Sequence, residues 1–303
     1  MPSRTNPRTL GNYEVHRAWE GFASIRQISS GEIMHSRTPP MEEARKLYIE
    51  QSDLAGRLQC SESEKPESTA PLLIWDVGLG AAANAMAAIL CYEEQTRNGP
   101  VRPLQIISFE NDLDSLRLAF RHRRDFPYLC HSGPAGILQD GAWQSPQHAG
   151  LSWLLLPGDF LETMATAPAP PDLIYYDMFS TKTSGDQWTL DAFRKVFEVC
   201  AGHATELFTY TCSTANRAAL LAAGFYVARG RNAGEKLETT IALTPTAYRA
   251  SSSRRRELLT SDWLEKWNRS AAKFPDAIGP HQYTRFEQAI RAHEQFREQR
   301  CNS

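Results

Sequence analysis

The sequence predicts an α/β protein with a doubly wound, mostly parallel sheet of seven strands, and three observations support this fold class. From residue 72 onward, apolar runs of strand length alternate with stretches of helical spacing, which is typical of strands joined by crossover helices. The first of these runs ends in a small-residue turn that leads into an alanine-rich helical pattern. The last two runs, at 225–229 and 239–243, are joined by a segment too short for a crossover helix, so we expect them to pair antiparallel.

Strands are predicted where short apolar runs are bounded by turn residues, and helices where apolar residues recur every three or four positions. This reading gives strands at 72–77, 104–109, 151–156, 172–177, 205–211, 225–229 and 239–243. It gives helices at 41–58 (after a Pro-Pro start signal), 81–95, 112–121, 186–200 and in the segment ending at 223. The other expectations are a disordered start over 1–12, a hairpin of 24–28 with 32–35, a polar linker over 60–70 and a loop insertion over 131–150. We therefore expect three parts: an N-terminal extension that packs on the core (1–70), a central domain (71–248) and a helical C-terminal extension (249–303).

Composition narrows the class of protein. The chain has 303 residues, of which 42% are hydrophobic and 22% charged, as is ordinary for a globular protein. Its net charge of −2 gives no indication of nucleic-acid binding. No apolar run is long enough for a membrane helix, and the first residues lead into no signal region, so we expect a cytoplasmic protein. Six cysteines without a C-x-x-C pair, and no His cluster of ligand spacing, make a disulfide framework or a metal site improbable.

The turn after the first strand is the strongest local signal. Gly78 and Gly80 allow a tight turn and a close backbone approach to a ligand, and the helix that follows offers unpaired N–H groups to an anion. Asp76, two residues before the first glycine, makes the motif D-x-G-x-G, the usual opening of an S-adenosylmethionine (SAM) site. The same stretch also fits a dinucleotide-binding fold, or a strand–helix turn with no ligand.

Four acids fall at predicted strand ends, where a doubly wound sheet binds its ligand. Asp76 is expected near the cationic methionine part of SAM, and Glu110 at the ribose hydroxyls. Asp159 is expected at the adenine amino group, with Phe160 on the ring, and Asp177 where the methyl acceptor approaches. Each acid has a structural alternative as a solvated strand end or a helix N-cap.

Several segments, in order along the chain, resemble the methyltransferase domain of the MnmC family. Asp177-Met178-Phe179-Ser180 followed by Gly185-Asp186-Gln187-Trp188 is similar to the family's D-G-F-x-P and N-P-x-x-W segments. The further similar segments are His35-Ser36 with Glu42-Glu43-Ala44-Arg45, Thr209-Tyr210-Thr211 with Arg217 and Ala223-Gly224-Phe225, and Gly234 to Glu238. The resemblance covers about residues 20–245.

This resemblance implies a SAM-dependent N-methyltransferase that methylates the aminomethyl group of a modified wobble uridine in tRNA. It further implies a stand-alone form without the family's FAD-dependent domain, so that a separate flavin-dependent enzyme would supply the aminomethyl group. Three departures concern the acceptor pocket: Met178 replaces the family's glycine, Thr181 its proline, and Asn216 a usually apolar residue. A small-molecule or natural-product acceptor is therefore the alternative, and a non-catalytic SAM-fold module and an NAD-dependent enzyme are weaker ones.

The predicted site follows from these motifs and from the resemblance. Asp177 is the expected catalytic residue, which holds the acceptor amine and either takes its proton or only positions it. The expected cofactor contacts are Asp76, Gly78, Gly80, Asn84, Glu110, Asn111, Asp159, Phe160 and Asp177, with no metal. The expected acceptor contacts are Met178, Phe179, Trp188 and Lys236, although Phe179 and Trp188 also fit core packing. Arginines 117, 121, 123 and 124 and arginines 254–256 are candidate RNA-binding clusters, or merely solvated faces.

Overall fold

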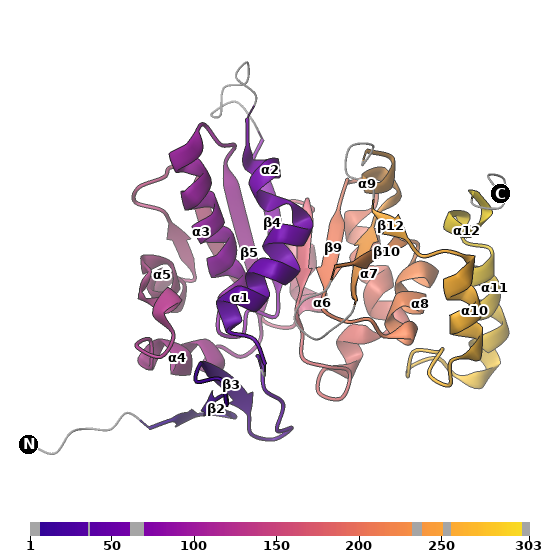
Figure 1. Ribbon diagram of the computed structural model, residues 1–303, viewed down its shortest axis with the longest axis horizontal. Helices are drawn as coiled ribbons and strands as arrows, with labels where there is room; N and C mark the ends of the chain where they lie inside the picture. Colours follow the sequence, from indigo (N-terminus) through magenta and orange to yellow (C-terminus); the bar gives the residue numbers. More distant parts are fainter. Residues whose placement is uncertain (1–6, 36, 61–69, 232–237, 251–255, 299–303) are drawn as a thin grey trace, which may run out of the picture. The chain divides into compact units, whose positions relative to one another are not determined.

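A computed structural model describes residues 7–35, 37–60, 70–231, 238–250 and 256–298. The chain divides into two compact units, Met1–Ala167 and Pro168–Ser303. Figure 1 shows the elements of each unit, with strands flanked by helices in both. The division into three parts at 70 and 248 stays a prediction.

The first unit begins with a small antiparallel sheet of strands β1 (Thr9–Leu10), β2 (Tyr13–Arg17) and β3 (Ala23–Gln27). The predicted hairpin of 24–28 with 32–35 is present in part: an antiparallel bridge joins Arg26 to Ile33, and the Gln27 and Met34 N–H groups donate to the Glu32 and Ile25 carbonyls. The longer ladder of β3, which the sequence did not predict, is with β2. The physical reason is burial, because Tyr13 and Val15 alternate toward the interior and give β2 an apolar face. The expectation of disorder over 1–12 was also wrong for β1, and residues 1–6 lie outside the described part.

The predicted helix over 41–58 is present as three shorter pieces: α1 (Pro40–Ala44), a π-helical segment η1 (Arg45–Glu50) and α2 (Leu54–Leu58). Asp53, with φ of 54°, lies between the last two and interrupts the helix. The expected apolar face is buried, and α1 and η1 contact α3. Of the predicted linker, residues 61–69 lie outside the described residues.

Parallel strands form the main sheet of the first unit. Its order is β4 (Leu72–Val77), β5 (Leu104–Glu110) and β7 (Leu151–Pro157), with β6 (Ala142–Gln144) antiparallel at the edge. The accompanying helices are α3 (Ala83–Asn98), α4 (Asp114–Arg121), α5 (Ser132–Asp140) and α6 (Phe160–Thr163), with short 3-10 turns η3 (Pro127–Cys130) and η4 (Met164–Thr166). The predicted strands and helices at 72–121 and 151–156 are confirmed within a few residues.

The predicted loop insertion over 131–150 was wrong, because it contains α5 and β6. The His131 side chain accepts from the Gly133 N–H and caps the start of α5, and Gly141, with φ of 69°, ends it. Histidine is an uncommon cap, which hid this short helix from pattern analysis.

The second unit contains the remaining predicted strands. Its order is β8 (Leu173–Tyr176), β9 (Glu206–Thr209), β11 (Thr239–Leu243), β10 (Tyr226–Gly230) and a short edge strand β12 (Glu257–Leu258). Strands β8 and β9 are parallel, while β11 is antiparallel to both β9 and β10. The predicted terminal antiparallel pair is therefore confirmed, and the α/β fold is mostly parallel in its core, as expected.

Helices of the second unit include the predicted C-terminal extension. They are η5 (Gly185–Trp188), α7 (Leu190–Cys200), α8 (Thr214–Ala223), α9 (Pro245–Ala250), α10 (Ser261–Arg269), η6 (Pro280–Gln282), α11 (Tyr283–Arg291) and α12 (Glu294–Glu298). Buried Gln295 ties the extension to the sheet, because its side chain accepts from the Val227 N–H at 2.7 Å and donates to the Val227 and Leu259 carbonyls. Within the described ranges, no helix is long and apolar enough to cross a membrane.

Candidate active site

The turn after β4 is built on left-handed backbone. Gly78 and Gly80 have φ of 84° and 52°, and Ala82 has φ of 64°, a conformation that costs a non-glycine residue on the order of 1 kcal/mol. The turn is held by bonds from the Gly78 N–H to the Phe109 carbonyl (3.1 Å) and from the Ala82 N–H to the Leu79 carbonyl (2.7 Å). Strain of this kind at a strand–helix turn is typical of a ligand-binding loop.

Helix α3 begins directly after this turn and presents its N-terminus there. Ala82 occupies the N-cap position and its side chain has no oxygen to accept from the first-turn N–H groups. No acidic residue lies in the first turn of this 16-residue helix, so its positive dipole end is not neutralised by its own sequence. This end of α3 therefore suits an anionic group such as the carboxylate of an amino acid.

Glu110 connects the end of β5 to the glycine turn. Its Oε2 accepts from the Gly80 N–H, and its Oε1 accepts from the N–H groups of Asn111 and Asp112, all at 3.0 Å. A carboxylate has about four lone-pair positions, so three backbone bonds leave room for one more donor. In this arrangement Glu110 both holds the turn and offers one acceptor position to a hydroxyl. Acceptance of both ribose hydroxyls, as the sequence predicts, would require one of the backbone bonds to lengthen.

Burial raises the pKa of Glu110, and the three backbone hydrogen bonds act in the opposite direction without cancelling it. We therefore expect SAM affinity to fall on acidification at a higher pH than an ordinary glutamate, with its pKa of about 4.3, would produce. A raised carboxyl pKa has the opposite effect on the ligand-free fold, because its free energy of unfolding decreases as the pH rises through that pKa. Calorimetric titration with SAM between pH 5 and 8, compared with Glu110→Gln, checks this; an equally steep profile in the variant would contradict it.

Asp76 lies beneath the turn in a buried polar chain. It is 1% exposed, Ser108 Oγ donates to its Oδ2 at 2.7 Å, and Trp153 Nε1 donates to Ser108 Oγ at 2.8 Å. Thus Ser108 of β5 fixes the carboxylate directly, and Trp153 of β7 orients Ser108. Sequence reasoning missed Ser108 and Trp153, although a serine within an otherwise apolar strand run was a usable signal.

The remaining cofactor candidates of the first unit lie at the same strand ends. The Gly158 N–H donates to the Glu110 carbonyl at 2.9 Å, which brings the segment carrying Asp159 beside the end of β5. Asp159 caps α6 by accepting from the Leu161 N–H at 2.8 Å, so the capping alternative applies to one of its oxygens. Phe160 is 3% exposed and packs edge-to-face on Phe109, with ring centroids 5.0 Å apart.

Two asparagines were also predicted to contact the cofactor. Asn84 is buried in the first turn of α3, and Asn111 is exposed after Glu110. The cofactor contacts of Asp159, Phe160 and both asparagines stay predictions.

The acceptor candidates belong to the second unit. Asp177 directly follows β8 and is half-buried. The two residues after it are held through their carbonyls, because Tyr210 Oη donates to Met178 at 3.1 Å and Trp188 Nε1 donates to Phe179 at 2.8 Å. Trp188 is only 2% exposed, so in this structure it packs in the core and fixes the segment after Asp177. Its predicted contact with the acceptor stays a prediction, and Lys236 lies outside the described residues.

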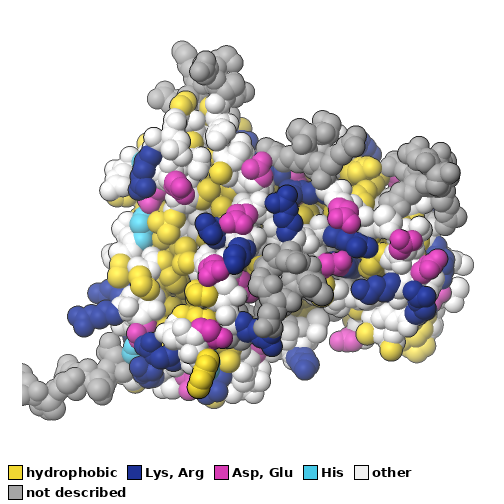
Figure 2. Space-filling model, in the orientation of Figure 1, with side chains coloured by type: hydrophobic (Ala, Val, Ile, Leu, Met, Phe, Trp, Pro, Cys, Tyr) yellow, Lys and Arg dark blue, Asp and Glu magenta, His cyan; other side chains and the backbone are white. Residues whose placement is uncertain are grey.

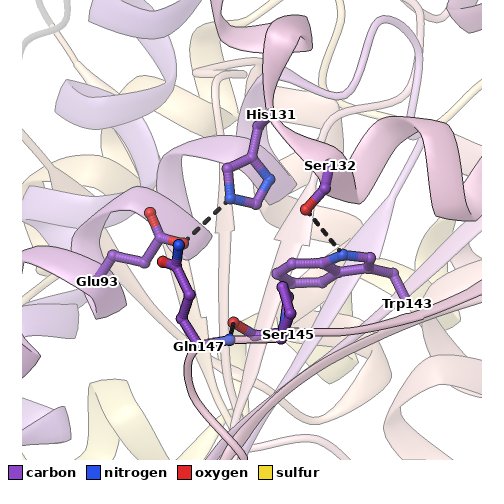
Figure 3. A pocket seen from close by; sticks show the side chains of 7 residues that line it. Glu93, His131, Ser132, Trp143, Ser145 and Gln147 are labelled. Atoms are coloured by element: carbon purple, nitrogen blue, oxygen red, sulfur yellow. Dashed lines mark hydrogen bonds and ion pairs between the residues drawn. The ribbon is translucent and has the colours of Figure 1, made fainter.

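One pocket of the first unit lies apart from these residues. It has a volume of about 240 Å³ and is lined by Glu93, His131, Ser132, Trp143, Ser145, Pro146 and Gln147. Figure 3 shows that its polar groups face one another: His131 Nε2 pairs with Glu93 at 3.1 Å, and Trp143 Nε1 donates to Ser132 at 3.1 Å. None of these residues was a predicted site residue. Among the residues placed by the structure, no group of three or more His, Cys, Asp or Glu side chains could hold a metal ion.

Comparisons with known proteins agree with this geometry. Residues 144–245 match a family model described as S-adenosyl-L-methionine-dependent methyltransferase. The crystal structure of MnmC2 from Aquifex aeolicus superposes with a TM-score of 0.64 at 21% identity, covering 94% of this chain and 85% of that one, and so shares the fold. The family match supports a SAM-dependent methyltransferase, and the structural match shows that the chain has the same fold.

Within that class, the chain is related to MnmC proteins. It is 27% identical over 250 residues to the tRNA 5-methylaminomethyl-2-thiouridine biosynthesis bifunctional protein MnmC of Aeromonas hydrophila, covering 76% of this chain and 36% of that protein. It is 28% identical over 240 residues to the protein of the same name from Burkholderia multivorans, covering 74% and 33%. The chain thus spans about a third of the length of these curated relatives.

Proposed function

We propose that this chain methylates the primary amine of an aminomethyl group on a modified wobble uridine of tRNA. The observation that carries the proposal is the similarity to MnmC proteins, which runs over about three quarters of the chain. It includes both the glycine turn bonded to Glu110 and the segment around Asp177. The proposal carries with it the expected cytoplasmic location and a flavin-dependent enzyme, separate from this stretch of chain, as the source of the aminomethyl group.

The first unit fits SAM. The uncapped start of α3 suits the carboxylate of its methionine part, and Glu110 keeps an acceptor position for a ribose hydroxyl. SAM supplies a methyl group already activated by the sulfonium. The protein therefore has to orient the acceptor and exclude water, and such orientation contributes several kcal/mol.

Asp177 is the proposed acceptor-binding carboxylate. It accepts a hydrogen bond from the neutral amine and directs the nitrogen lone pair toward the methyl carbon. After transfer, the nitrogen carries an extra proton, which passes to Asp177 or to water. Phe179 and Met178 follow Asp177 directly, and their carbonyls are fixed by Trp188 and Tyr210, so the segment is held in one conformation. We propose that these two side chains shape the acceptor pocket.

Replacing Asp177 by Ala is expected to leave SAM affinity unchanged and to lower kcat at least about a hundredfold. Asp177→Asn separates the two roles, because asparagine keeps a hydrogen-bond acceptor but takes no proton. An Asn variant near the wild-type rate indicates positioning alone, and one as slow as the Ala variant indicates proton transfer. The measurement is single-turnover methyl transfer with SAM binding followed by calorimetry. Full activity in Asp177→Ala would remove Asp177 from the proposed site.

A small-molecule acceptor is the second candidate, favoured by Met178 and Thr181 where the resembling family has glycine and proline. Transfer of a radiolabelled methyl group to bulk tRNA from cells lacking this gene decides between the two. Labelled tRNA supports the wobble-uridine proposal, and nuclease digestion then identifies the nucleoside. SAM binding without labelling of tRNA would favour the small-molecule acceptor.

A further inference from the structure

Trp19 is fully exposed in the turn between β2 and β3. Its side chain has 100% of its possible exposure, whereas the other large exposed apolar side chains of the described residues, Ile28 and Leu90, have 49% and 40%. A tryptophan in this position adds nothing to the core, and its indole face is available to a flat partner.

The turn that carries Trp19 is fixed next to an arginine-rich segment. Arg17 Nη2 binds Asp125 Oδ1 at 2.8 Å, which ties the end of β2 to the residues after α4. His122 Nε2 lies 3.2 Å from the Pro7 carbonyl, which ties the start of the described chain to the same place. We call the exposed residues gathered here the Trp19 surface: Trp19, Arg8, Arg17, Arg117, Arg121, Arg123 and Arg124.

Positive charge exceeds negative charge on this surface. The carboxylates nearby are Glu20, Asp112, Asp114 and Asp125. Asp125 pairs with Arg17, Asp114 pairs with Arg117 at 3.1 Å, and Asp112 is half-buried. In Figure 2, Lys and Arg side chains gather at the lower left, over α4 and the β2–β3 hairpin of Figure 1. The other predicted cluster differs, because Arg256 is bound to buried Glu206 at 2.7 Å and residues 251–255 lie outside the described part.

The hairpin lies at the cofactor end of the first unit. Helix α4 begins shortly after β5 and contacts β1, β2 and β3, so the hairpin packs close to the end of β5. Met34, shortly after β3, has its sulfur 3.2 Å from where a Cβ on Gly80 would lie. The hairpin that carries Trp19 therefore packs, through the residues after β3, against the part of the unit that holds the glycine turn.

We infer that the Trp19 surface binds an unpaired segment of RNA, with one base stacked on Trp19 and the neighbouring phosphates on its arginines. The combination of an exposed aromatic face and surrounding guanidinium groups fits this ligand, because stacking tolerates any base and arginine pairs with phosphate. The inference rests on the proposed function, for which the RNA is tRNA, and it adds where on the chain the RNA is held.

The test measures binding of fluorescein-labelled tRNA by anisotropy over a range of salt concentrations. Trp19→Ala is expected to weaken binding about tenfold, and Trp19→Phe, which keeps an aromatic face, to stay within about twofold of wild type. The plot of log K against log salt has a negative slope, and removing Arg121 and Arg124 together is expected to make that slope shallower by roughly 1.4. Arg97→Ala is the matched control, because Arg97 is exposed near the opposite end of α3 in the same unit and should leave the slope unchanged.

SAM titration of every variant distinguishes failure of the RNA-binding inference from failure of the proposed function. All variants should bind SAM as wild type does, since none removes a predicted cofactor contact. Wild-type binding and methylation of tRNA with no loss in Trp19→Ala or in the double arginine variant would overturn this inference alone. Wild-type protein that binds SAM but neither binds nor methylates tRNA would overturn the proposed function, and this inference with it.

Discussion

Replacing Arg217 by Ala is expected to lower the free energy of unfolding by about 3–5 kcal/mol. Arg217, on α8, is 2% exposed, and each nitrogen of its guanidinium has a partner. Nη1 binds Glu238 Oε2 at 2.9 Å, Nη2 donates to the Thr239 carbonyl at 2.8 Å, and Nε donates to Thr240 Oγ1 at 3.0 Å. Truncation would leave a partly buried carboxylate and a buried carbonyl without this donor, as well as a cavity.

Arg194→Ala is the matched control, because Arg194 on the neighbouring helix α7 pairs with Asp191 at the surface, where the side chains are 51% and 83% exposed. Its loss should change the free energy of unfolding by less than about 0.5 kcal/mol. Denaturant unfolding of both variants beside wild type makes the comparison. A cost for Arg217→Ala as small as that for Arg194→Ala would mean that the buried pair does not stabilise the fold.

The Arg217 effect should also depend on pH. Partial burial pushes the pKa of Glu238 upward, but the hydrogen bond and charge of Arg217, together with the charges of Arg229 and Lys266, outweigh it and hold that pKa below its usual value. A lowered carboxyl pKa contributes stability that is present above the unfolded pKa and is lost as pH falls through the folded pKa. The difference in the free energy of unfolding between wild type and Arg217→Ala should therefore become smaller once the pH falls below about 4.

The sequence predicted strands and glycine turns well where one local pattern was sufficient. The apolar run before Gly78 predicted a buried strand, and the segment between β10 and β11 was too short for a crossover helix. Both predictions are confirmed by β4 and by the antiparallel pairing of β10 with β11. Pairing partners were harder, because β2 and β3 meet through burial of Tyr13 and Val15, which local spacing around Gly31 does not reveal.

Side-chain roles were harder still to predict. Glu110 was identified as a ligand acid from its place at a strand end, but nothing local shows that three backbone N–H groups already point at its carboxylate. Trp188 was predicted either as a pocket wall or as core packing, and its burial depends on Tyr176 in β8, Phe193 in α7 and Tyr210 after β9. Arg217, in an alanine-rich helix, has the residue type of an exposed position and is buried only because β11 and Glu238 supply its partners.

Replacing Gly80 by Val is expected to abolish detectable SAM binding. Gly80 has φ of 52°, which a β-branched residue adopts only at considerable cost, and a Cβ there would lie 3.2 Å from the sulfur of Met34. The change also displaces the N–H that binds Glu110, so the turn and the proposed ribose acceptor are disturbed together. Calorimetric titration with SAM measures the loss, and thermal unfolding without ligand shows whether the fold persists.

Gly141→Val separates loss of the site from backbone strain. Gly141 lies in the same unit with φ of 69°, and a Cβ there would meet nothing within 4 Å. Both variants carry the strain of a valine in left-handed backbone, so both should lower Tm, and Gly80→Val should lower it further because of its contact with Met34. Only Gly80→Val should lose SAM, because only Gly80 lies in the turn bonded to Glu110. If Gly141→Val lost SAM equally, the loss would reflect general destabilisation, and if Gly80→Val bound SAM normally, the glycine turn would not be the cofactor site.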